Sequence, residues 1–484
     1  MHDHHHHNPI LCILPPHMIE AIARSGNSEE REWALRMLAA DTTVRSHRTT
    51  TAALQAAAPP AAPSLTPHKQ RQIYTANQGS ALPGTLVRSE GQGPTGDAAS
   101  DEAYDGLGAT FDLYWNIFQR NSIDNAGMNM LGSVHYLQGY DNAFWNGTQM
   151  VFGDGDGTYF NRFTISIDVM GHELTHGVTA HQANLVYQDQ PGALNESISD
   201  VFGSLVKQYH SSQTAAQADW LIGAGLFTSA VNGVALRSMK APGTAYDDPH
   251  LGKDPQPANM SGYVTTTADN GGVHINSGIP NHAFYLCAVA LGGYAWEKAG
   301  MIWYATLCDP RLASTAQFQD FANLTADNAG RLFGDVEQQA VINAWKQVGI
   351  IVTAAAPKVS GNWTLHYSWG PTYTYGQVNL VFNPNNTFTG AFTGKWQQQD
   401  GTLLLAFDTG PAKYAGTVDA NIGSGSMSTF AGLDGAWYLS KQGTVGLALP
   451  VASLAPGMVD PAGTVVAAPA PIEAEDREPV GVGS

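Results

Sequence analysis

Apolar residues recur with two different spacings along this chain, and the spacing changes near residue 353. Before that point most apolar runs have the helical period of three to four residues, whereas residues 359–449 alternate apolar and polar side chains. The pattern predicts an α+β region followed by an all-β domain of about six to eight short strands, a small barrel or sandwich. The elements predicted before residue 353 are strands at 73–74, 86–87, 128–136 and 142–145, and helices at 17–40, 100–120, 168–181, 281–292, 294–306, 315–331 and 335–347, with one more opening near 195.

Near its start the chain has a short apolar stretch, Ile10–Leu14, which the prolines Pro15 and Pro16 end. No basic region precedes the stretch and no small-residue cleavage site lies near it, so we do not predict a signal peptide. The histidine-rich residues 1–7 are left out of the fold prediction. An extended piece and one helix bury little by themselves, so we expect the segment up to residue 40 to pack on the larger domain.

Three segments have the composition of linkers or disordered chain. Residues 45–68 are rich in Thr, Ala and Pro, and flexible segments of this kind are where proteolytic nicking concentrates. Maturation cleavage between Arg45 and Arg71 is therefore a hypothesis. Residues 353–357 form a second linker, and residues 451–484, rich in Pro, Ala and Val with an acidic cluster, are expected to be disordered.

The β domain is rich in aromatic residues at alternating positions. Trp363, Leu365, Tyr367 and Trp369 alternate along one predicted strand, and turn signals stand at 383–386, 400–401 and 434–435. These aromatics could bind carbohydrate, lipid or protein. Packing inside the domain is the favoured alternative.

Charge and cysteine content exclude several classes of protein. The net charge is −18, from 23 Lys and Arg against 41 Asp and Glu, which argues against a nucleic-acid partner. The 3 cysteines provide no disulfide framework, and Cys287 and Cys308 lie in apolar helical patterns typical of core residues. No apolar run reaches the length of a membrane span.

The most informative stretch is His172-Glu-Leu-Thr-His176 within the predicted helix 168–181. Residues four apart lie on one face of a helix, so His172 and His176 can offer two imidazole nitrogens to one metal ion. Glu173 stands beside that face, where a carboxylate can reach a metal-bound water. This is the spacing of a zinc peptidase helix.

A second stretch, Asn195-Glu-Ser-Ile-Ser-Asp200, opens another apolar-periodic segment. Catalytic zinc takes three protein ligands and keeps a fourth position open, and Glu196 can be the third ligand. Asp200, on the same helix face as Glu196, can accept the other ring N–H of a ligating histidine. A first-turn acid favoured by the helix dipole is the alternative for Glu196.

Together these two stretches resemble the thermolysin family of zinc metalloendopeptidases. The segments Tyr140–Gly147, Gly153-Asp-Gly-Asp-Gly157 and Asp269–Gly278 are also similar to family signatures, and Pro15-Pro16 resembles the protealysin-like branch with a short propeptide. The resemblance implies a two-lobed peptidase with one zinc ion that acts on proteins or peptides. It implies a propeptide at 1–45, a linker at 46–69, a β-rich lobe with the zinc helix at 70–205 and a helical lobe at 206–352, outside which lie the β domain at 358–450 and the tail at 451–484.

The resemblance also assigns roles to residues outside the zinc motif. Glu173 is expected to be the general base, and His274, oriented and charged by Asp269, and Tyr187 to donate to the oxyanion. The edge-strand residues Asn142 and Ala143 are expected to pair with the substrate backbone, and Arg237 to contact a substrate carbonyl. As isolated residues, Tyr187 would usually pack and Arg237 would form a surface ion pair. A pocket for bulky apolar residues on the amino side of the new N-terminus is expected from Phe160, Phe163, Val169, Ile222 and Leu236.

The sequence departs from calcium-rich members of that family. Asp168 matches one acid of their double calcium site, but Lys207, Leu221 and Ala224 stand where the other ligands would be. A lysine carries the opposite charge to a calcium ligand. We infer that the Lys207 ammonium takes the place of the metal beside Asp168, so calcium as a cofactor is in doubt.

Three questions stay open in the sequence. The Cys12 thiolate could occupy the open zinc position and silence the enzyme, although burial as a small apolar residue is favoured. The resemblance favours a secreted monomer, while the missing signal peptide leaves cytoplasmic residence open. A catalytically silent binding module that acts through the β domain is the alternative function, and the presence of Glu173 and His274 argues against it.

Overall fold

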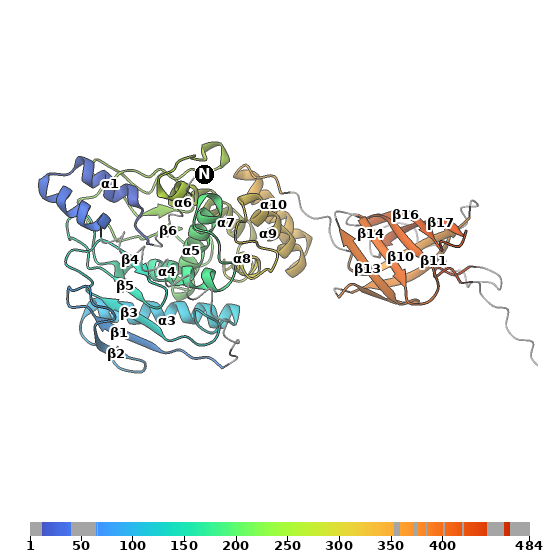
Figure 1. The fold of residues 1–484 in the computed structure, drawn as a ribbon, viewed down its shortest axis with the longest axis horizontal. Coiled ribbons are helices and arrows are strands. Elements are labelled where there is room, and N and C mark those ends of the chain that lie inside the picture. Colours follow the sequence, from blue (N-terminus) through green and yellow to red (C-terminus); the bar gives the residue numbers. More distant parts are fainter. Residues whose placement is uncertain are drawn as a thin grey trace, which may run out of the picture. The chain divides into compact units, whose positions relative to one another are not determined.

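The computed structural model shows two compact units that divide after residue 353. The residues it describes are 12–39, 64, 66–352, 359–442 except 371–374, 384, 400–401 and 419–420, and 459–464. The histidine-rich start, most of the 45–68 segment and the 353–357 linker thus lie outside the described residues. Figure 1 colours the first unit from blue to yellow and the second from orange to red.

The N-terminal lobe of the first unit is built on a mixed five-stranded sheet with the strand order β2-β1-β3-β5-β4. Its strands are β1 (Arg71–Thr75), β2 (Thr85–Ser89), β3 (Met130–Val134), β4 (Ala143–Trp145) and β5 (Met150–Phe152). Helix α3 (Ala98–Phe118), which Asp97 caps by accepting from the Ser100 N–H, packs on β1 and β3. β4 lies at the sheet edge, and Cys12 pairs with Phe144 there as an antiparallel bridge.

Helices α4 (Ile167–His181) and α5 (Asp189–His210) pack closely along one another in the middle of this unit. Glycine permits this approach, because a Cβ atom on Gly203 of α5 would lie 2.4 Å from the carbonyl oxygen of Asp168. The contact brings one face of α4 onto α5. Helix α5 begins earlier than the predicted start near 195, so Glu196 lies in its second turn and the first-turn alternative is wrong.

The rest of the first unit is helical mainly after residue 268, whereas residues 211–268, also predicted to be mostly helical, form turns and short strands. Its elements are η1 (Phe163–Ile165), β6 (Leu221–Ile222), β7 (Arg237–Ser238), β8 (Asp247–Asp248), β9 (Gly252–Lys253), η2 (Met260–Gly262), α6 (Asp269–Asn276), α7 (Gly278–Leu291), α8 (Ala299–Leu307), α9 (Phe318–Leu332) and α10 (Asp335–Gln347). Helix α8 starts later than predicted, because residues 295–298 form a turn.

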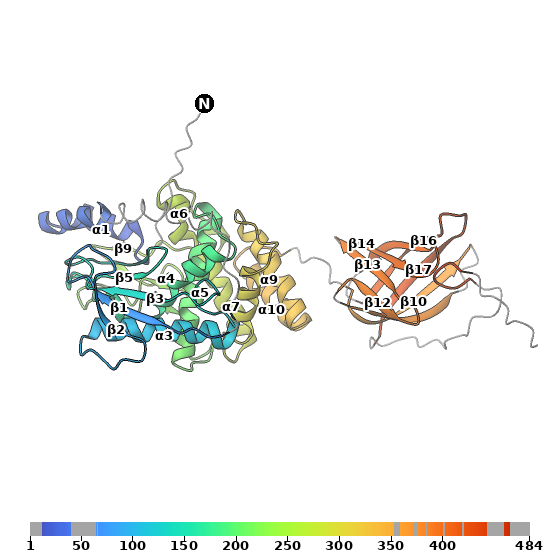
Figure 2. The ribbon, with the colours of Figure 1, turned by 60° about the horizontal axis from the view of Figure 1, so that its bottom comes forward.

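The single helix predicted over residues 17–40 is wrong, because the segment forms two helices. Helix α1 (Pro16–Ser25) ends at Gly26, and residues 28–39 form a second helix. Asn27 begins the second helix by accepting from the backbone N–H groups of Glu29 and Glu30. As expected, both helices pack on the larger domain: Trp33 donates to the Gly139 carbonyl at 3.0 Å. Figure 2 shows α1 on the opposite side of the unit from α3.

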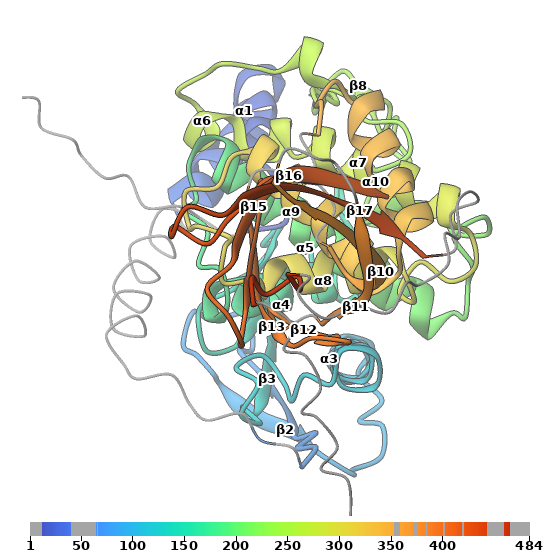
Figure 3. The ribbon, with the colours of Figure 1, turned by 90° about the vertical axis from the view of Figure 1, so that its right-hand side faces the viewer.

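The second unit is a closed barrel of eight antiparallel strands in sequence order, so the barrel alternative holds. Its strands are β10 (Gly361–Trp369), β11 (Gly376–Phe382), β12 (Thr387–Gly390), β13 (Gly394–Gln399), β14 (Thr402–Phe407), β15 (Lys413–Val418), β16 (Ile422–Ser428) and β17 (Asp434–Lys441). Figure 3 shows these strands arranged around the barrel. Trp363, Leu365 and Tyr367 are buried in its core, which supports interior packing for these aromatics.

Several local predictions are wrong. Asp434 and Gly435 begin strand β17, and the turn precedes them. Residues 459–464 of the predicted disordered tail pack on the barrel, because Trp369 and Tyr414 donate to the carbonyls of Asp460 and Pro461. Residues 400–401 and the rest of the tail lie outside the described residues.

Two further predictions need correction. Residues 64 and 66–68 are not free linker, since the Asn121 side chain donates to the carbonyls of Ser64 and Thr66. Cys308 is exposed where helix α8 ends, whereas Cys287 is buried as predicted. Within the part of the chain that the structure describes, no helix combines the length and apolar character that a bilayer-spanning segment needs.

Candidate active site

The side chains of His172, His176 and Glu196 converge between helices α4 and α5. The two histidine Nε2 atoms are 3.0 Å apart, and Glu196 Oε2 and Oε1 lie 3.5 and 3.4 Å from the Nε2 atoms of His172 and His176. Ligands about 2.0–2.1 Å from a tetrahedral zinc ion are roughly 3.3–3.4 Å apart, so these spacings fit one ion. Glu196 Oε2 has no hydrogen bond within the described chain, as expected of an atom that binds metal.

The ligand histidines are held by acceptors on α5. His172 Nδ1 donates to Asp200 at 2.8 Å, and His176 Nδ1 donates to the Asn195 side-chain oxygen at 2.8 Å. A proton on Nδ1 leaves each Nε2 lone pair for the metal. Asn195 stands inside the sequence motif, but its role was not predicted, because an amide before an acid carries no distinctive signal.

Asp200 is the centre of a buried ion pair. Arg237 donates to both Asp200 oxygens, at 2.8 and 2.7 Å, and Asn281 donates to one of them at 2.8 Å. Burial opposes the charged form of Asp200, but Arg237 and His172 outweigh it and hold the pKa of the carboxyl well below its usual range. Asp200 is thus an anion that fixes both a ligand histidine and Arg237. Asn281 was not singled out from the sequence.

Glu173 is fully buried on α4 beside the metal-ligand face. One of its oxygens accepts from the backbone N–H of Trp145 at 3.0 Å. The edge strand β4 therefore orients the carboxylate. Only backbone atoms of Trp145 make this contact, which is why residue type did not reveal it.

His274 and Tyr187 border the same cluster. The backbone before His274 bends through Asn270, Gly271 and Gly272, all with positive φ, and a Cβ on Gly271 would meet Asp189. His274 Nδ1 donates to Asp269 at 2.6 Å, and its Nε2 lies 3.2 Å from the Tyr187 hydroxyl. Burial opposes the imidazolium, but Asp269 and Glu196 outweigh it and raise the pKa of His274 to about 9. Near neutral pH this side chain is a charged donor.

Tyr187 lies between α4 and α5, as the sequence indicated. Its hydroxyl donates to Glu196, and burial and that carboxylate raise the pKa of Tyr187 well above its ordinary value. The phenol therefore stays protonated and keeps a proton to donate.

The N-terminal segment enters this site through residues 12–14. Ile13 donates its N–H to the Ala143 carbonyl at 3.3 Å and accepts from Arg237 at 3.0 Å. Leu14 donates to the Asn142 side chain at 3.2 Å, and the Cys12 carbonyl accepts from His274 Nε2 at 3.2 Å. Residues 12–14 thus bind the groups for which substrate contacts were predicted.

The five predicted pocket residues are buried in one continuous core together with Ile13. They are Phe160, Phe163, Val169, Ile222 and Leu236. Ile13 itself is 0% exposed. An apolar side chain next to the Cys12 carbonyl is therefore enclosed by apolar surroundings.

The metal cluster does not include the Cys12 thiol. Among the described residues, the group of ligand atoms within 4.8 Å of one another consists of His172, His176 and Glu196. At Cys12 the backbone carbonyl reaches the site residues, which gives the thiol-ligand hypothesis no geometric support.

The predicted calcium position beside Asp168 holds an ammonium group. Lys207 Nζ lies 2.8 Å from Asp168, 2.9 Å from Asp219 and 2.8 Å from the Leu221 carbonyl that accepts from it. The Ala224 carbonyl accepts from Ser166 instead. The positive charge that Asp168 needs is supplied by the chain itself.

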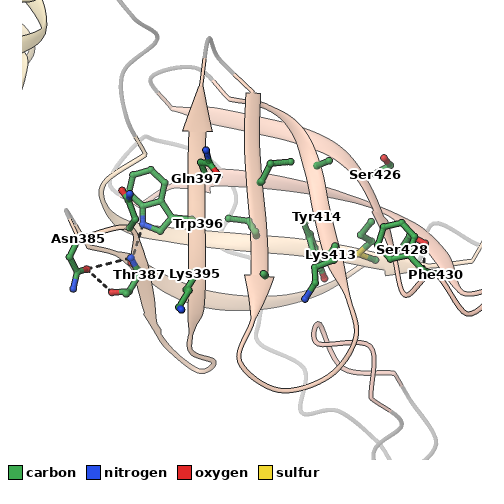
Figure 4. Close-up of a pocket in the computed structure, with 16 residues that line it drawn as sticks. Asn385, Thr387, Lys395, Trp396, Gln397, Lys413, Tyr414, Ser426, Ser428 and Phe430 are labelled. Carbon is green, nitrogen blue, oxygen red and sulfur yellow. Dashed lines mark hydrogen bonds between the residues drawn. The ribbon is translucent and has the colours of Figure 1, made fainter. Parts of the chain in front are cut away.

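A separate depression of about 850 Å³ lies on the outer face of the barrel, across β13 to β16 (Figure 4). Lys395, Ala406 and Lys413 are directly paired on neighbouring strands, with both lysines exposed. Phe430, 81% exposed, stands at one end. Most of the lining surface is apolar, and the polar side chains beside it include Lys395, Gln397, Lys413 and Ser426.

Comparison with known proteins agrees with this geometry. Two family models match, "Thermolysin metallopeptidase, catalytic domain" over residues 43–180 and its "alpha-helical domain" over residues 183–350. The chain is 52% identical over 352 residues to an extracellular metalloprotease of Pectobacterium carotovorum subsp. carotovorum, a match that covers 71% of this chain and 97% of that protein. It is 55% identical over 284 residues to Protease PrtS of Photorhabdus sp. (strain Az29), over 58% of this chain and 76% of that protein.

A solved structure is similar over the same region. The precursor of protealysin, a metalloproteinase from Serratia proteamaculans, shares 55% sequence identity with a TM-score of 0.64 and covers 70% of this chain and 99% of that chain. Both family models end before strand β10. The chain therefore belongs to the thermolysin family of zinc metallopeptidases, enzymes that hydrolyse peptide bonds.

Proposed function

We propose that this metalloendopeptidase is made as a proenzyme whose residues 12–39 block the substrate cleft. The supporting observation is that the backbone of Ile13 forms hydrogen bonds with both Ala143 and Arg237. A chain held there excludes a substrate strand from the edge of β4. The similarity to a structure described as a precursor of protealysin agrees with this proposal.

The proposed substrate has a bulky apolar residue on the amino side of the new N-terminus. Ile13 follows the carbonyl that faces His274, and its buried side chain stands where such a substrate residue would be. A polar side chain there would lose its hydration without a partner. The preference should therefore favour residues such as Leu, Ile and Phe.

Catalysis is divided among the chain's own residues. His172, His176 and Glu196 would hold the zinc ion, which when bound polarises the scissile carbonyl and acidifies water. Glu173, held by the backbone of strand β4, accepts a proton from the attacking water and returns it to the leaving amine. His274 and Tyr187 donate hydrogen bonds to the oxygen on which negative charge develops.

Substrate orientation follows from the remaining groups. Asn142 and Ala143 bind the backbone of the substrate, and Arg237, fixed by Asp200, donates to the carbonyl that follows the scissile bond. Removal of the segment before residue 71 would open the cleft. The names of the bacterial relatives support an extracellular site of action.

The decisive experiment compares casein hydrolysis by the chain without residues 1–70 and by its Glu173→Ala variant. Hydrolysis by the unchanged enzyme alone, abolished by a zinc chelator, is the expected result. The full chain should show much lower activity. A full chain as active as the shortened one would refute the proenzyme proposal and leave the peptidase activity standing.

A second candidate function, binding by the barrel, is favoured by the exposed lysines of the outer depression. Residues 359–442 carry 3 lysines and 4 aspartates without Arg or Glu, in a chain of net charge −18. Within the described part of the barrel, neither Lys395 nor Lys413 lies within ion-pair distance of a carboxylate, and Asp408 accepts from Thr393 instead. The proposed occupant is a carboxylate-bearing glycan, which would pair with the ammonium groups and stack on Phe430.

Retention of the full chain on immobilised polygalacturonate tests this candidate. The double variant Lys395→Gln, Lys413→Gln should no longer bind the immobilised ligand. Lys441→Gln, a charge change outside the depression, should bind it as well as the unchanged chain. Neutral dextran is the ligand control. Absence of retention, or retention unchanged in the double variant, would refute the glycan site without affecting the peptidase.

A further inference from the structure

The segment Cys12–Leu14 lies in the cleft with the polarity of a substrate. In order along the chain, the Cys12 carbonyl faces His274, the Ile13 N–H faces Ala143, the Ile13 carbonyl faces Arg237 and the Leu14 N–H faces Asn142. The antiparallel bridge between Cys12 and Phe144 has the same direction. A segment bound in the opposite direction would place backbone N–H groups where the Cys12 and Ile13 carbonyls now accept hydrogen bonds.

This register identifies one peptide bond among those in the cleft. The carbonyl that accepts from His274 is the one on which His274 and Tyr187 are positioned to stabilise negative charge. The bond that follows that carbonyl joins Cys12 to Ile13. The apolar side chain on its amino side, Ile13, satisfies the proposed substrate preference.

We propose that the Cys12–Ile13 bond is a self-cleavage site of the zinc-loaded chain. The inference rests on the proposed function, because it uses the same catalytic groups. Water adds its oxygen to the Cys12 carbonyl carbon and gives one proton to Glu173. The C–N bond then breaks and the proton passes from Glu173 to the Ile13 nitrogen. Glu173 transfers the second water proton in the same way, so the products are a Cys12 carboxylate and a protonated Ile13 amine.

Cleavage at this bond does not by itself open the enzyme. Residues after Ile13 stay attached to the peptidase lobe through contacts that the cut leaves intact. Tyr159 donates to Glu30 at 2.7 Å, Trp33 donates to Gly139 at 3.0 Å, and the Ser25 hydroxyl donates to the His250 carbonyl at 3.2 Å. The new amine remains beside the Ala143 carbonyl, so the product is held in place as an inhibitor.

Product retention also explains why a substrate-like segment can keep the site closed. After the cut, α1 and the 28–39 helix still hold the segment that begins at Ile13, so this segment continues to occupy the substrate site. Pro15 and Pro16 follow at once, and their fixed φ stiffens the segment between the cleft and α1. Activation therefore requires a second event, the removal of both helices.

The test incubates the full chain with zinc and identifies new N-termini by mass spectrometry. The expected product begins at Ile13 and forms with a first-order rate that does not depend on protein concentration. The other product, residues 1–12, carries one ¹⁸O atom in its Cys12 carboxylate when the water is labelled. Glu173→Gln and the chelated chain should stay intact. The cut chain should remain inactive on casein until residues 1–70 are removed.

A second readout does not depend on turnover. A synthetic peptide of residues 8–18 should bind the Glu173→Gln chain that lacks residues 1–70, and the Ile13→Asp change in the peptide should weaken binding more than tenfold. Active enzyme that never yields the Ile13 terminus, or an Ile13→Asp peptide that binds as well as the unchanged one, would overturn the self-cleavage site. Loss of casein hydrolysis altogether would instead refute the proposed function.

Discussion

The Ile13→Ala change tests whether insertion of one apolar side chain keeps the proenzyme silent. Ile13 is 0% exposed and belongs to the same buried core as the predicted pocket residues, so the substitution removes buried apolar surface while the backbone bonds to Ala143 and Arg237 can remain. Truncating a buried Ile or Leu to Ala costs about 2–5 kcal/mol. The cleft opens to water once the segment leaves, so the lower end, about 2–3 kcal/mol, applies. At 1.4 kcal/mol per tenfold change, inhibition should weaken about 30- to 150-fold.

The assay measures inhibition of the chain without residues 1–70 by a separate peptide of residues 1–45. A fluorogenic peptide with Leu after the scissile bond reports activity, and the inhibition constant is compared with and without Ile13→Ala. Leu35→Ala is the matched control, because Leu35 is on the same segment but 56% exposed. An Ile13→Ala effect below threefold, or an equal effect of Leu35→Ala, would refute the reasoning.

Four further predictions follow from single contacts. Lys207→Met leaves the buried Asp168 carboxylate without its ammonium partner, which should lower the free energy of unfolding by about 3 kcal/mol. The thermal midpoint should then fall by about 6–12 °C. Adding Asp168→Asn to the same chain should restore part of the midpoint. A calcium-selective chelator should leave the unchanged chain's midpoint where it was. Asn195→Ala should weaken zinc binding about 10- to 100-fold in competition with a chromophoric chelator. His135 is half-buried, which opposes its charged form, but Asp154 and Asp97 outweigh burial and raise its pKa. The stability that the charged form adds is present below pH 6.5 and is lost as the pH rises through the raised pKa. His135→Asn should therefore make the thermal midpoint depend less on pH between about pH 6 and 9. Cys12→Ser should inhibit as well as the unchanged propeptide peptide, and loss of inhibition would restore the thiol-ligand hypothesis.

The metal cluster was predictable because helix geometry is local. His172 and His176 share a face whatever surrounds the helix, and Glu196 follows in a second apolar-periodic segment. The barrel was predictable for a similar reason, since alternation along Trp363, Leu365 and Tyr367 requires one buried face. In both cases the spacing of residues along a single helix or strand is enough to predict which side chains share a face.

Boundaries and ends were harder because competing local signals decide them. Residues 17–40 have an apolar pattern that suits one helix, yet Asn27 accepts from two N–H groups of the next turn and starts a new one. Composition marked the C-terminal tail as disordered, but the Trp369 indole donates to a carbonyl 91 positions away. Such long-range donors leave no trace in the composition of the segment they bind.

The N-terminal segment shows most clearly where sequence-based inference stops. From the sequence, Cys12 ahead of two prolines suggested a role for its thiol, because a sequence shows which side chains are present and not which backbone groups form contacts. The contacts that define the register are instead made by the backbone of Cys12, Ile13 and Leu14, and any residue has those groups. What the sequence does contribute is Ile13, the one apolar side chain that follows the carbonyl facing His274. The register of the backbone and the apolar side chain of Ile13 together place the Cys12–Ile13 bond of the blocking segment where the enzyme's own catalytic groups can attack it.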